Sequence, residues 1–293
     1  MRVAAALLLL SLSAPHLALA QGLPFHTQSA LTTAFEEKGL RAFSMVQRRG
    51  DMTASVSPIV LLPWAPHHRV TTMVVLPMVH KSLAASAPAV GSPYSATGIG
   101  DVALSVKWAF FARNRFAGTT RFAVIVSGSL PTGATESRLG TGEVAPRPLQ
   151  LGKGTGSVGT TLVATLVRDR WGFNADVGHV LYGSDDGFRS GSVTRYDVAI
   201  GFRIPRHIET IRTRTLQLYL EWNGSFAERS RQGGADLVNT GGHLAYLSPG
   251  VQWVVLPQLL FEGSLQVPVI HDPYGTQIDP GIRPAFGLRF LFF

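Results

Sequence analysis

The amino-acid sequence predicts an all-β fold: a transmembrane, antiparallel, up-and-down β-barrel of about twelve strands. Three observations support this prediction: an export signal at the start, alternation of apolar and polar residues along most of the chain, and a last strand rich in aromatic residues. Beyond the export signal, no apolar run is long enough for a membrane-spanning helix. A chain that crosses a bilayer without helices must close a barrel, because every backbone amide in lipid needs a hydrogen-bond partner.

Residues 1–20 have the pattern of a signal peptide. Arg2 supplies a positive charge, residues 3–12 form an apolar core, and Ala18-Leu19-Ala20 is a small-residue cleavage site. A single anchoring helix is the alternative, but its apolar run is short and interrupted by a proline. We therefore expect cleavage after Ala20, a periplasmic lead-in over 21–39 and a barrel over 40–293 in a Gram-negative outer membrane.

The alternation that indicates strands is clearest in residues 99–112. Val102, Leu104, Val106, Trp108 and Phe110 fall on one face, and the intervening positions are small or polar and include a lysine. Side chains of a β-strand point to opposite faces in turn, so one side of this strand is apolar and the other tolerates charge. One such strand fits a soluble sheet as well as a barrel, whereas its repetition in an exported chain favours the barrel.

Twelve segments of the chain are candidate strands, and most have the ten or so residues that a tilted transmembrane strand needs. Short connections alternate with longer ones rich in Gly, Ser, Asp and Pro, which is typical of periplasmic turns and external loops; the longest is 132–156. Ten or fourteen strands remain alternatives, and the second and third segments are apolar on both faces. The segments are 40–48, 52–62, 69–80, 99–112, 120–131, 157–169, 172–182, 192–204, 214–227, 242–255, 258–268 and 283–293.

The chain ends in a strand with alternating aromatic residues. Counting back in twos from Phe292 meets only phenylalanine and leucine, whereas counting back from Phe293 reaches Arg289, which is unsuited to lipid. We expect Phe292 to set the lipid-facing register. We also expect the barrel-insertion machinery to read Phe292 and Phe293.

Composition excludes several classes of protein. The chain has no cysteine, so disulfides, zinc–thiolate sites and cysteine nucleophiles are ruled out. The formal charge is +8, yet charged residues make up only 15% of the chain and no dense basic run is interleaved with aromatics. With an export signal, this balance argues against nucleic acid as a partner and favours lipid phosphates at the rim or an anion-favouring lumen.

A glycine-containing motif precedes the clearest strand. It is Gly98-Ile99-Gly100-Asp101; the glycines permit a tight turn, and the aspartate can cap backbone amides. With Lys107 in the following strand, the segment Ser127–Gly133 and the terminal phenylalanine, the chain resembles the "MetA-pathway of phenol degradation" outer-membrane family. The resemblance implies a barrel that passes or handles hydrophobic, often aromatic, compounds, and it implies no set of functional residues.

The candidate functional residues are charged side chains predicted to face the lumen. Ionisable groups at membrane depth are costly unless they face water or each other. They can form a selectivity filter, or a hydrogen-bonded network that fills a narrow barrel. The candidates are Lys107, Arg121, Asp176, Arg195, Asp197, Arg203, Glu221 and Glu262. The loop 132–156 also has two interpretations: it folds inward as a gate or binds a ligand, or it is a mobile external loop.

Catalysis has little support in the sequence. The nine histidines show no compact metal-ligand spacing, and no His-x-Ser pairing like that of outer-membrane phospholipases occurs. We therefore expect no enzyme activity, catalytic residue, cofactor or metal. The predicted function is passive passage of small hydrophobic or aromatic solutes; the alternatives are a non-conducting structural or ligand-binding barrel and, with less support, a lipase-type hydrolase.

Overall fold

The computed structural model describes residues 24–32, 38–49, 52–83, 94–204, 214–256 and 258–292. The predicted signal peptide and Phe293 lie outside these residues. Within them, no helix is long and apolar enough to cross a membrane.

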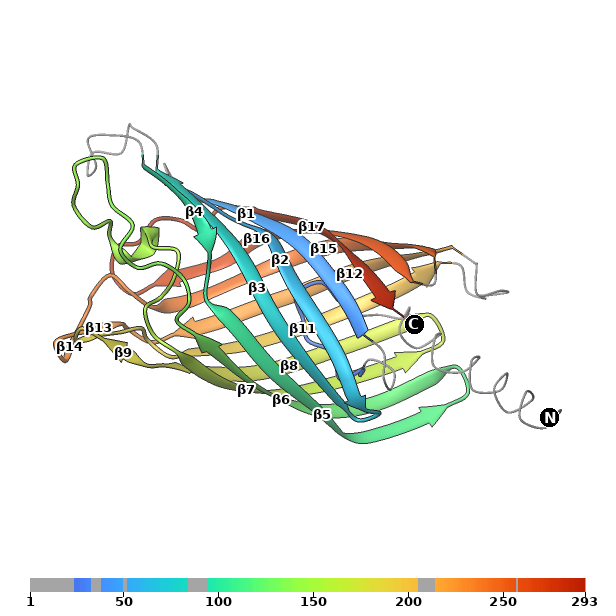
Figure 1. Ribbon diagram of the computed structural model, residues 1–293. Coiled ribbons are helices and arrows are strands. Elements are labelled where there is room, and N and C mark those ends of the chain that lie inside the picture. Colours follow the sequence, from blue (N-terminus) through green and yellow to red (C-terminus); the bar gives the residue numbers. More distant parts are fainter. Residues whose placement is uncertain are drawn as a thin grey trace.

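The chain forms one closed antiparallel barrel of twelve strands, which confirms the predicted fold and strand count (Figure 1). Consecutive strands pair, and β1 pairs with β17 to close the ring. The observed bounds agree with the predicted ones within a few residues, although several strands extend further at one end. The strands are β1 Lys38–Arg49, β2 Met52–His67, β3 Val70–Leu83, β5 Val102–Arg115, β6 Gly118–Leu130, β7 Ser157–Arg168, β8 Trp171–Tyr182, β11 Val193–Ile204, β12 Thr215–Ala227, β15 Gly242–Leu256, β16 Leu259–Pro273 and β17 Arg283–Phe292.

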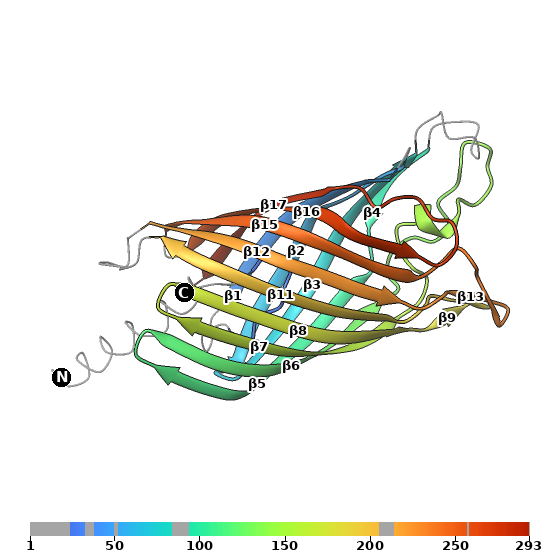
Figure 2. The same ribbon diagram turned by 180° about the vertical axis from the view of Figure 1, so that it is seen from behind.

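The two ends of the barrel differ. Strand β17 finishes at the end where β1 starts, because Phe292 pairs with Lys38; we call this the C-terminal end. The opposite end, the loop end, carries a small four-stranded sheet and the short 3₁₀ helix η1 (Arg147–Leu149) (Figure 2). The strands of that small sheet are β9 Ser184–Asp185, β10 Phe188–Arg189, β13 Arg231–Gln232 and β14 Ala235–Asp236.

The barrel is apolar outside and polar inside, the reverse of a water-soluble sheet. On β12, Leu216, Leu218 and Leu220 are 36%, 44% and 45% exposed. On the other face of the same strand, Gln217 and Glu221 point inward and are 2% and 0% exposed. A surface of exposed leucine, valine and aromatic side chains around a closed sheet is the surface that a lipid bilayer covers.

The register of β17 follows Phe292, as predicted. Phe286 and Phe292 are 64% and 50% exposed on the outside. Arg289 is on the opposite face, where it pairs across the sheet with Arg41 and contacts Glu262 inside the barrel.

The glycine motif anchors the long external loop. Strand β4 (Tyr94–Ile99) pairs with the loop-end half of β3, and Gly100 and Asp101 separate it from β5. The carboxylate of Asp101 accepts hydrogen bonds from the backbone N–H of Gly133 at 3.0 Å and of Lys153 at 2.9 Å. The expected capping role of Asp101 is thus confirmed, and it ties both ends of loop 132–156 to the barrel wall.

Loop 132–156 is held along its length as well as at its ends. The Lys81 ammonium donates to the backbone carbonyls of Pro148 and Gln150, and the Tyr94 hydroxyl donates to the carbonyl of Leu149. Asp101, Lys81 and Tyr94 therefore anchor the loop to the barrel wall, and none of its residues lines the lumen cavity described below.

Candidate functional site

The described residues 24–32 lie inside the barrel. They contact inward-facing side chains of β1, β5, β7, β8, β12 and β17, and Ala30 packs in a buried cluster with residues of β5, β6 and β7. We call this stretch the lumen segment. The sequence-based expectation placed it in a lead-in outside the barrel, and the structure corrects that expectation for these residues.

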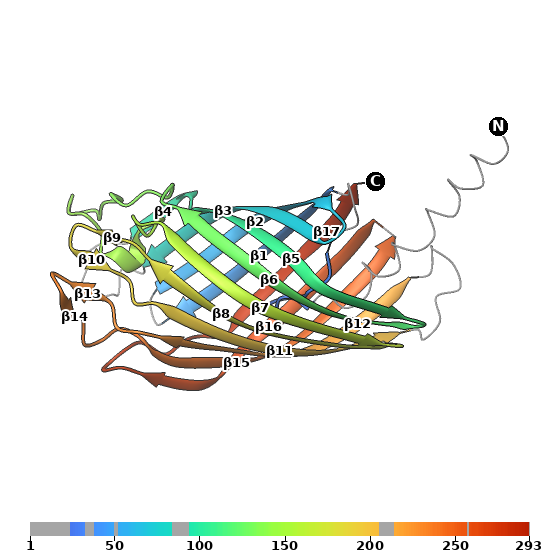
Figure 3. The same ribbon diagram turned by 90° about the horizontal axis from the view of Figure 1, so that it is seen from below.

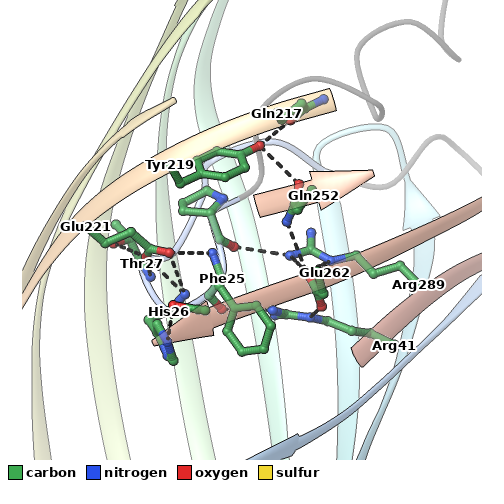
Figure 4. Close-up of polar contacts among 12 residues, drawn as sticks. Phe25, His26, Thr27, Arg41, Gln217, Tyr219, Glu221, Gln252, Glu262 and Arg289 are labelled. Atoms are coloured by element: carbon green, nitrogen blue, oxygen red, sulfur yellow. Dashed lines mark hydrogen bonds and ion pairs between the residues drawn. The ribbon is translucent and has the colours of Figure 1, made fainter. Parts of the chain in front are cut away.

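Glu221 is the main anchor of the lumen segment. Its carboxylate is fully buried and accepts hydrogen bonds from three consecutive backbone N–H groups: Phe25 at 2.7 Å, His26 at 3.0 Å and Thr27 at 2.7 Å (Figure 4). The Thr27 hydroxyl donates a further bond at 2.8 Å. A buried carboxylate is tolerated only when such donors replace its water, so Glu221 and the lumen segment stabilise each other.

A second anchor is a buried ion-pair cluster. Glu262 pairs with Arg41 at 2.6 Å and with Arg289 at 2.6 Å, and it also accepts a bond from the Gln252 amide at 2.9 Å. Both arginines also donate to the lumen segment: Arg41 to the carbonyl of Phe25 at 2.8 Å and Arg289 to that of Pro24 at 3.2 Å. Figure 4 shows this cluster beside the Glu221 site.

Charged side chains of the barrel wall also hold the rest of the lumen segment. Asp176 accepts a hydrogen bond from the backbone N–H of Gln28 at 2.6 Å. The Lys107 ammonium donates to the carbonyls of Ser29 and Leu31 at 2.7 and 3.1 Å. Carboxylates of the wall therefore accept hydrogen bonds from backbone N–H groups, and cations of the wall donate hydrogen bonds to backbone carbonyls. These backbone groups of the lumen segment thus have hydrogen-bond partners although the segment pairs with no strand.

The last described residue of the segment reaches the turn between β2 and β3. The Thr32 hydroxyl donates to the carbonyl of His68 at 3.1 Å, and the Arg121 guanidinium donates to that hydroxyl at 3.4 Å. Lys38, the next described residue, starts β1. The lumen segment thus spans the lumen from the β17 side to the β2–β3 turn, and both of its described ends lie toward the C-terminal end of the barrel; Figure 3 shows these strands from below.

A cavity of about 470 Å³ lies between the lumen segment and the barrel wall. One side of the cavity is apolar and formed mainly by β2, β3, β5 and β6, with Leu61, Pro63, Met73, Val75, Ala103 and Ile125. The other side is polar and includes Asp176, Asp197 and Arg195. The second and third predicted strands are apolar on both faces because their inner faces form the wall of this cavity.

The eight predicted candidates separate into three groups. Five hold the lumen segment, directly or through an arginine: Lys107, Arg121, Asp176, Glu221 and Glu262. Arg195 and Asp197 border the cavity. Arg203 lies apart from both, at the C-terminal end of β11, where it is 8% exposed and donates to the carbonyl of Asp169 at 3.4 Å.

Sequence reasoning missed Arg41, Arg289 and the lumen segment. A signal for Arg289 was present, since an arginine that lies between leucine and phenylalanine in the last strand is unsuited to lipid. The partners of the lumen segment left no comparable signal, because Phe25 and Glu221 are 196 positions apart. Within the described ranges, no group of three or more His, Cys, Asp or Glu side chains is arranged to hold a metal ion.

Comparison with known proteins supports the fold. No protein-family model matches the chain, and no curated protein sequence matches it. A crystal structure of an outer membrane channel from Pseudomonas putida F1 superimposes with a TM-score of 0.66 at 13% identity, covering 93% of this chain and 97% of that one. At this identity the likeness establishes a shared barrel fold, while the family named in the sequence analysis stays a resemblance.

Two further solved structures show weaker similarity. The β domain of the Bordetella autotransporter BrkA has a TM-score of 0.47 at 11% identity, covering 87% of this chain and 99% of that one. LpxR from Salmonella typhimurium has a TM-score of 0.44 at 10% identity, covering 88% of this chain and all of that one (100%). At these TM-scores, neither structure informs the function of this chain.

Proposed function

We propose that this protein is a channel of the Gram-negative outer membrane that takes up small hydrophobic or aromatic compounds and is closed by the lumen segment in the state described. The observation that carries the proposal is the cavity of about 470 Å³ with an apolar wall inside a closed barrel. Small-molecule sites are typically concave, mostly apolar and ringed by a few polar groups, and cavities of about 300–1,000 Å³ suffice for them.

The membrane setting follows from the exterior and the loops. The barrel exposes an apolar surface, and its longer connections gather at the loop end. In outer-membrane barrels the short turns are periplasmic and the long loops external, so the C-terminal end faces the periplasm in this proposal. Export with cleavage after Ala20, and insertion guided by Phe292 and Phe293, belong to the same proposal.

The polar network is a specific argument for the second candidate function, a ligand-binding barrel that does not conduct. Glu221, Glu262 and their partners fill the β12–β16 side of the lumen with satisfied hydrogen bonds. A network of this kind is stable and resists opening. The two functions differ in whether the lumen segment leaves its anchors, and a transport measurement distinguishes them.

The test places a bulky side chain in the cavity. Met73→Trp puts an indole against the apolar wall, while the matched control Met78→Trp puts the same group on the outside of the same strand, where Met78 is 44% exposed. Uptake of a radiolabelled aromatic hydrocarbon into proteoliposomes should fall several-fold in the first variant and stay unchanged in the control. Equal uptake by both variants contradicts passage through the cavity. If the parent protein takes up no hydrocarbon, the channel is refuted and the non-conducting, ligand-binding barrel is supported.

A further inference from the structure

Basic side chains gather on the outer surface at the C-terminal end of the barrel. Lys38 begins β1, Arg115 ends β5, Arg168 ends β7 and Arg214 precedes β12, and all four are exposed. Arg113, two positions before Arg115, is exposed as well. We call these five residues the basic collar. They lie directly beyond the apolar band of the strands that carry them.

The β5–β6 hairpin carries Arg113 and Arg115 of this collar beyond the start of the neighbouring strand β3. Pairing of β3 with β5 stops at Trp108, and all six residues from Phe110 to Arg115 are exposed. Phe116, in the turn, is fully exposed, and Phe111 and Phe122 are each 41% exposed. Aromatic side chains next to arginines are typical of the interface between acyl chains and head groups, where an aromatic ring reaches the apolar layer and a cation stays at the phosphates.

The geometry of the collar leaves room for a phosphate. Gly118 pairs across the sheet with Arg115 on one side and with Arg168 on the other. The two arginines are therefore two strand spacings apart, about 10 Å, with no side chain between them. The next residues in this cross-strand row are Trp171 and Phe202, and the guanidinium of Arg170 lies 4.5 Å from the centre of the Phe202 ring.

The described residues at this end carry charge of almost entirely one sign. Among the described residues of these turns and strand ends, the single carboxylate is that of Asp169. At the loop end, the outward positions of β3, β8 and β15 carry His80, His179 and His243, which are hydrogen-bonded to hydroxyl groups of neighbouring strands. On β5 and β7, the outward-facing Arg113, Arg115 and Arg168 all lie at the C-terminal end, where one leaflet meets the protein in this proposal.

We propose that the basic collar binds the head groups of anionic phospholipids in the leaflet at the C-terminal end, with the phosphate held between Arg115 and Arg168. The bilayer attracts each basic side chain near its surface through its negative potential, and the aromatic residues of the hairpin fix the depth of the collar. This inference is independent of what the lumen transports.

The test compares lipid retention by the full-length mature protein. Purified protein is equilibrated with mixed micelles of phosphatidylethanolamine and phosphatidylglycerol, and co-purifying lipid is counted by native mass spectrometry. The collar variant changes Arg113, Arg115 and Arg168 to Gln. The control variant changes three exposed arginines of the loop end, Arg138, Arg189 and Arg231, to Gln, so both lose the same net charge.

The parent and the control should retain phosphatidylglycerol in preference to phosphatidylethanolamine. The collar variant should bind phosphatidylglycerol about fivefold more weakly for each charge removed, or roughly a hundredfold in all. Unchanged retention by the collar variant overturns the proposal, and so does an equal loss in both variants, which would indicate a response to net charge alone. Heat-modifiable gel mobility verifies that each barrel is folded, and the single Arg168→Gln variant replaces the triple one if the latter does not fold.

Discussion

Replacing Glu221 with Ala should release the lumen segment. The wild-type carboxylate accepts bonds at 2.7, 3.0 and 2.7 Å from three consecutive backbone N–H groups, and a fourth at 2.8 Å from the Thr27 hydroxyl. Bonds to charged groups contribute about 1.5–3 kcal/mol each, but water will partly replace them in the variant. Each neutral donor that stays buried without its acceptor costs about 1–3 kcal/mol. A total loss of about 4 kcal/mol raises the ratio of open to closed states roughly a thousandfold.

Two assays measure this change. Hydrogen exchange of the amides of Phe25, His26 and Thr27 should accelerate by two to three orders of magnitude, about the factor expected from the lost bonds. Planar-bilayer recordings should show a larger conductance or a higher open probability. Glu221→Gln, which keeps one acceptor oxygen, should lie between the parent and Glu221→Ala, and Asp236→Ala in an exposed ion pair of the loop end should change neither readout.

The reasoning fails if the three amides exchange at the parental rate in a correctly folded Glu221→Ala barrel. In that case contacts elsewhere along the segment would hold it without the carboxylate. Faster exchange with unchanged conductance would instead show that the segment leaves Glu221 without opening a path.

Three other predictions concern the remaining anchors and the cavity. Glu262→Ala leaves Arg41 and Arg289 without their carboxylate partner, so the free energy of unfolding should fall by about 3–5 kcal/mol. Urea titrations in lipid measure this change, and a loss below about 1 kcal/mol would contradict the structural role of Glu262. Asp101→Ala should free both ends of loop 132–156 and accelerate trypsin cleavage within it while the barrel keeps its heat-modifiable mobility; an unchanged cleavage rate would show that the other loop contacts suffice. Arg195→Ala removes a cation that borders the cavity and should shift reversal potentials toward cation preference, while the same change at Arg203, which is remote from the cavity, should leave them unchanged.

The strands could be predicted from the sequence because their signal is local. A period of two, repeated in twelve segments, fixes which residues face lipid, and it identified the inward positions of Lys107, Glu221 and Glu262 correctly. Strand β2 was harder to read because its inner face lines an apolar cavity, so the alternation is weak there. The length of this segment and the turns on either side of it still predicted a strand there.

The lumen segment could not be predicted, for a physical reason. It has no periodicity, since its backbone groups are satisfied one by one by side chains and not by a neighbouring strand. Each of those partners lies on a different strand, so no short stretch of sequence contains both sides of a contact. The inward charges were recognised as a possible network, but the peptide that completes the network was not.

The sequence separation of these contacts has a consequence for assembly. The lumen segment precedes every strand of the barrel, yet its anchor on β12 is 196 positions away from Phe25, and Arg289 on the last strand contacts the carbonyl of Pro24. Contacts of such high sequence separation form late, because the chain between them must first be ordered. We therefore expect the lumen segment to complete its contacts only after β12 and β17 are in place, so that a nascent barrel passes through a stage in which this segment does not yet fill the lumen.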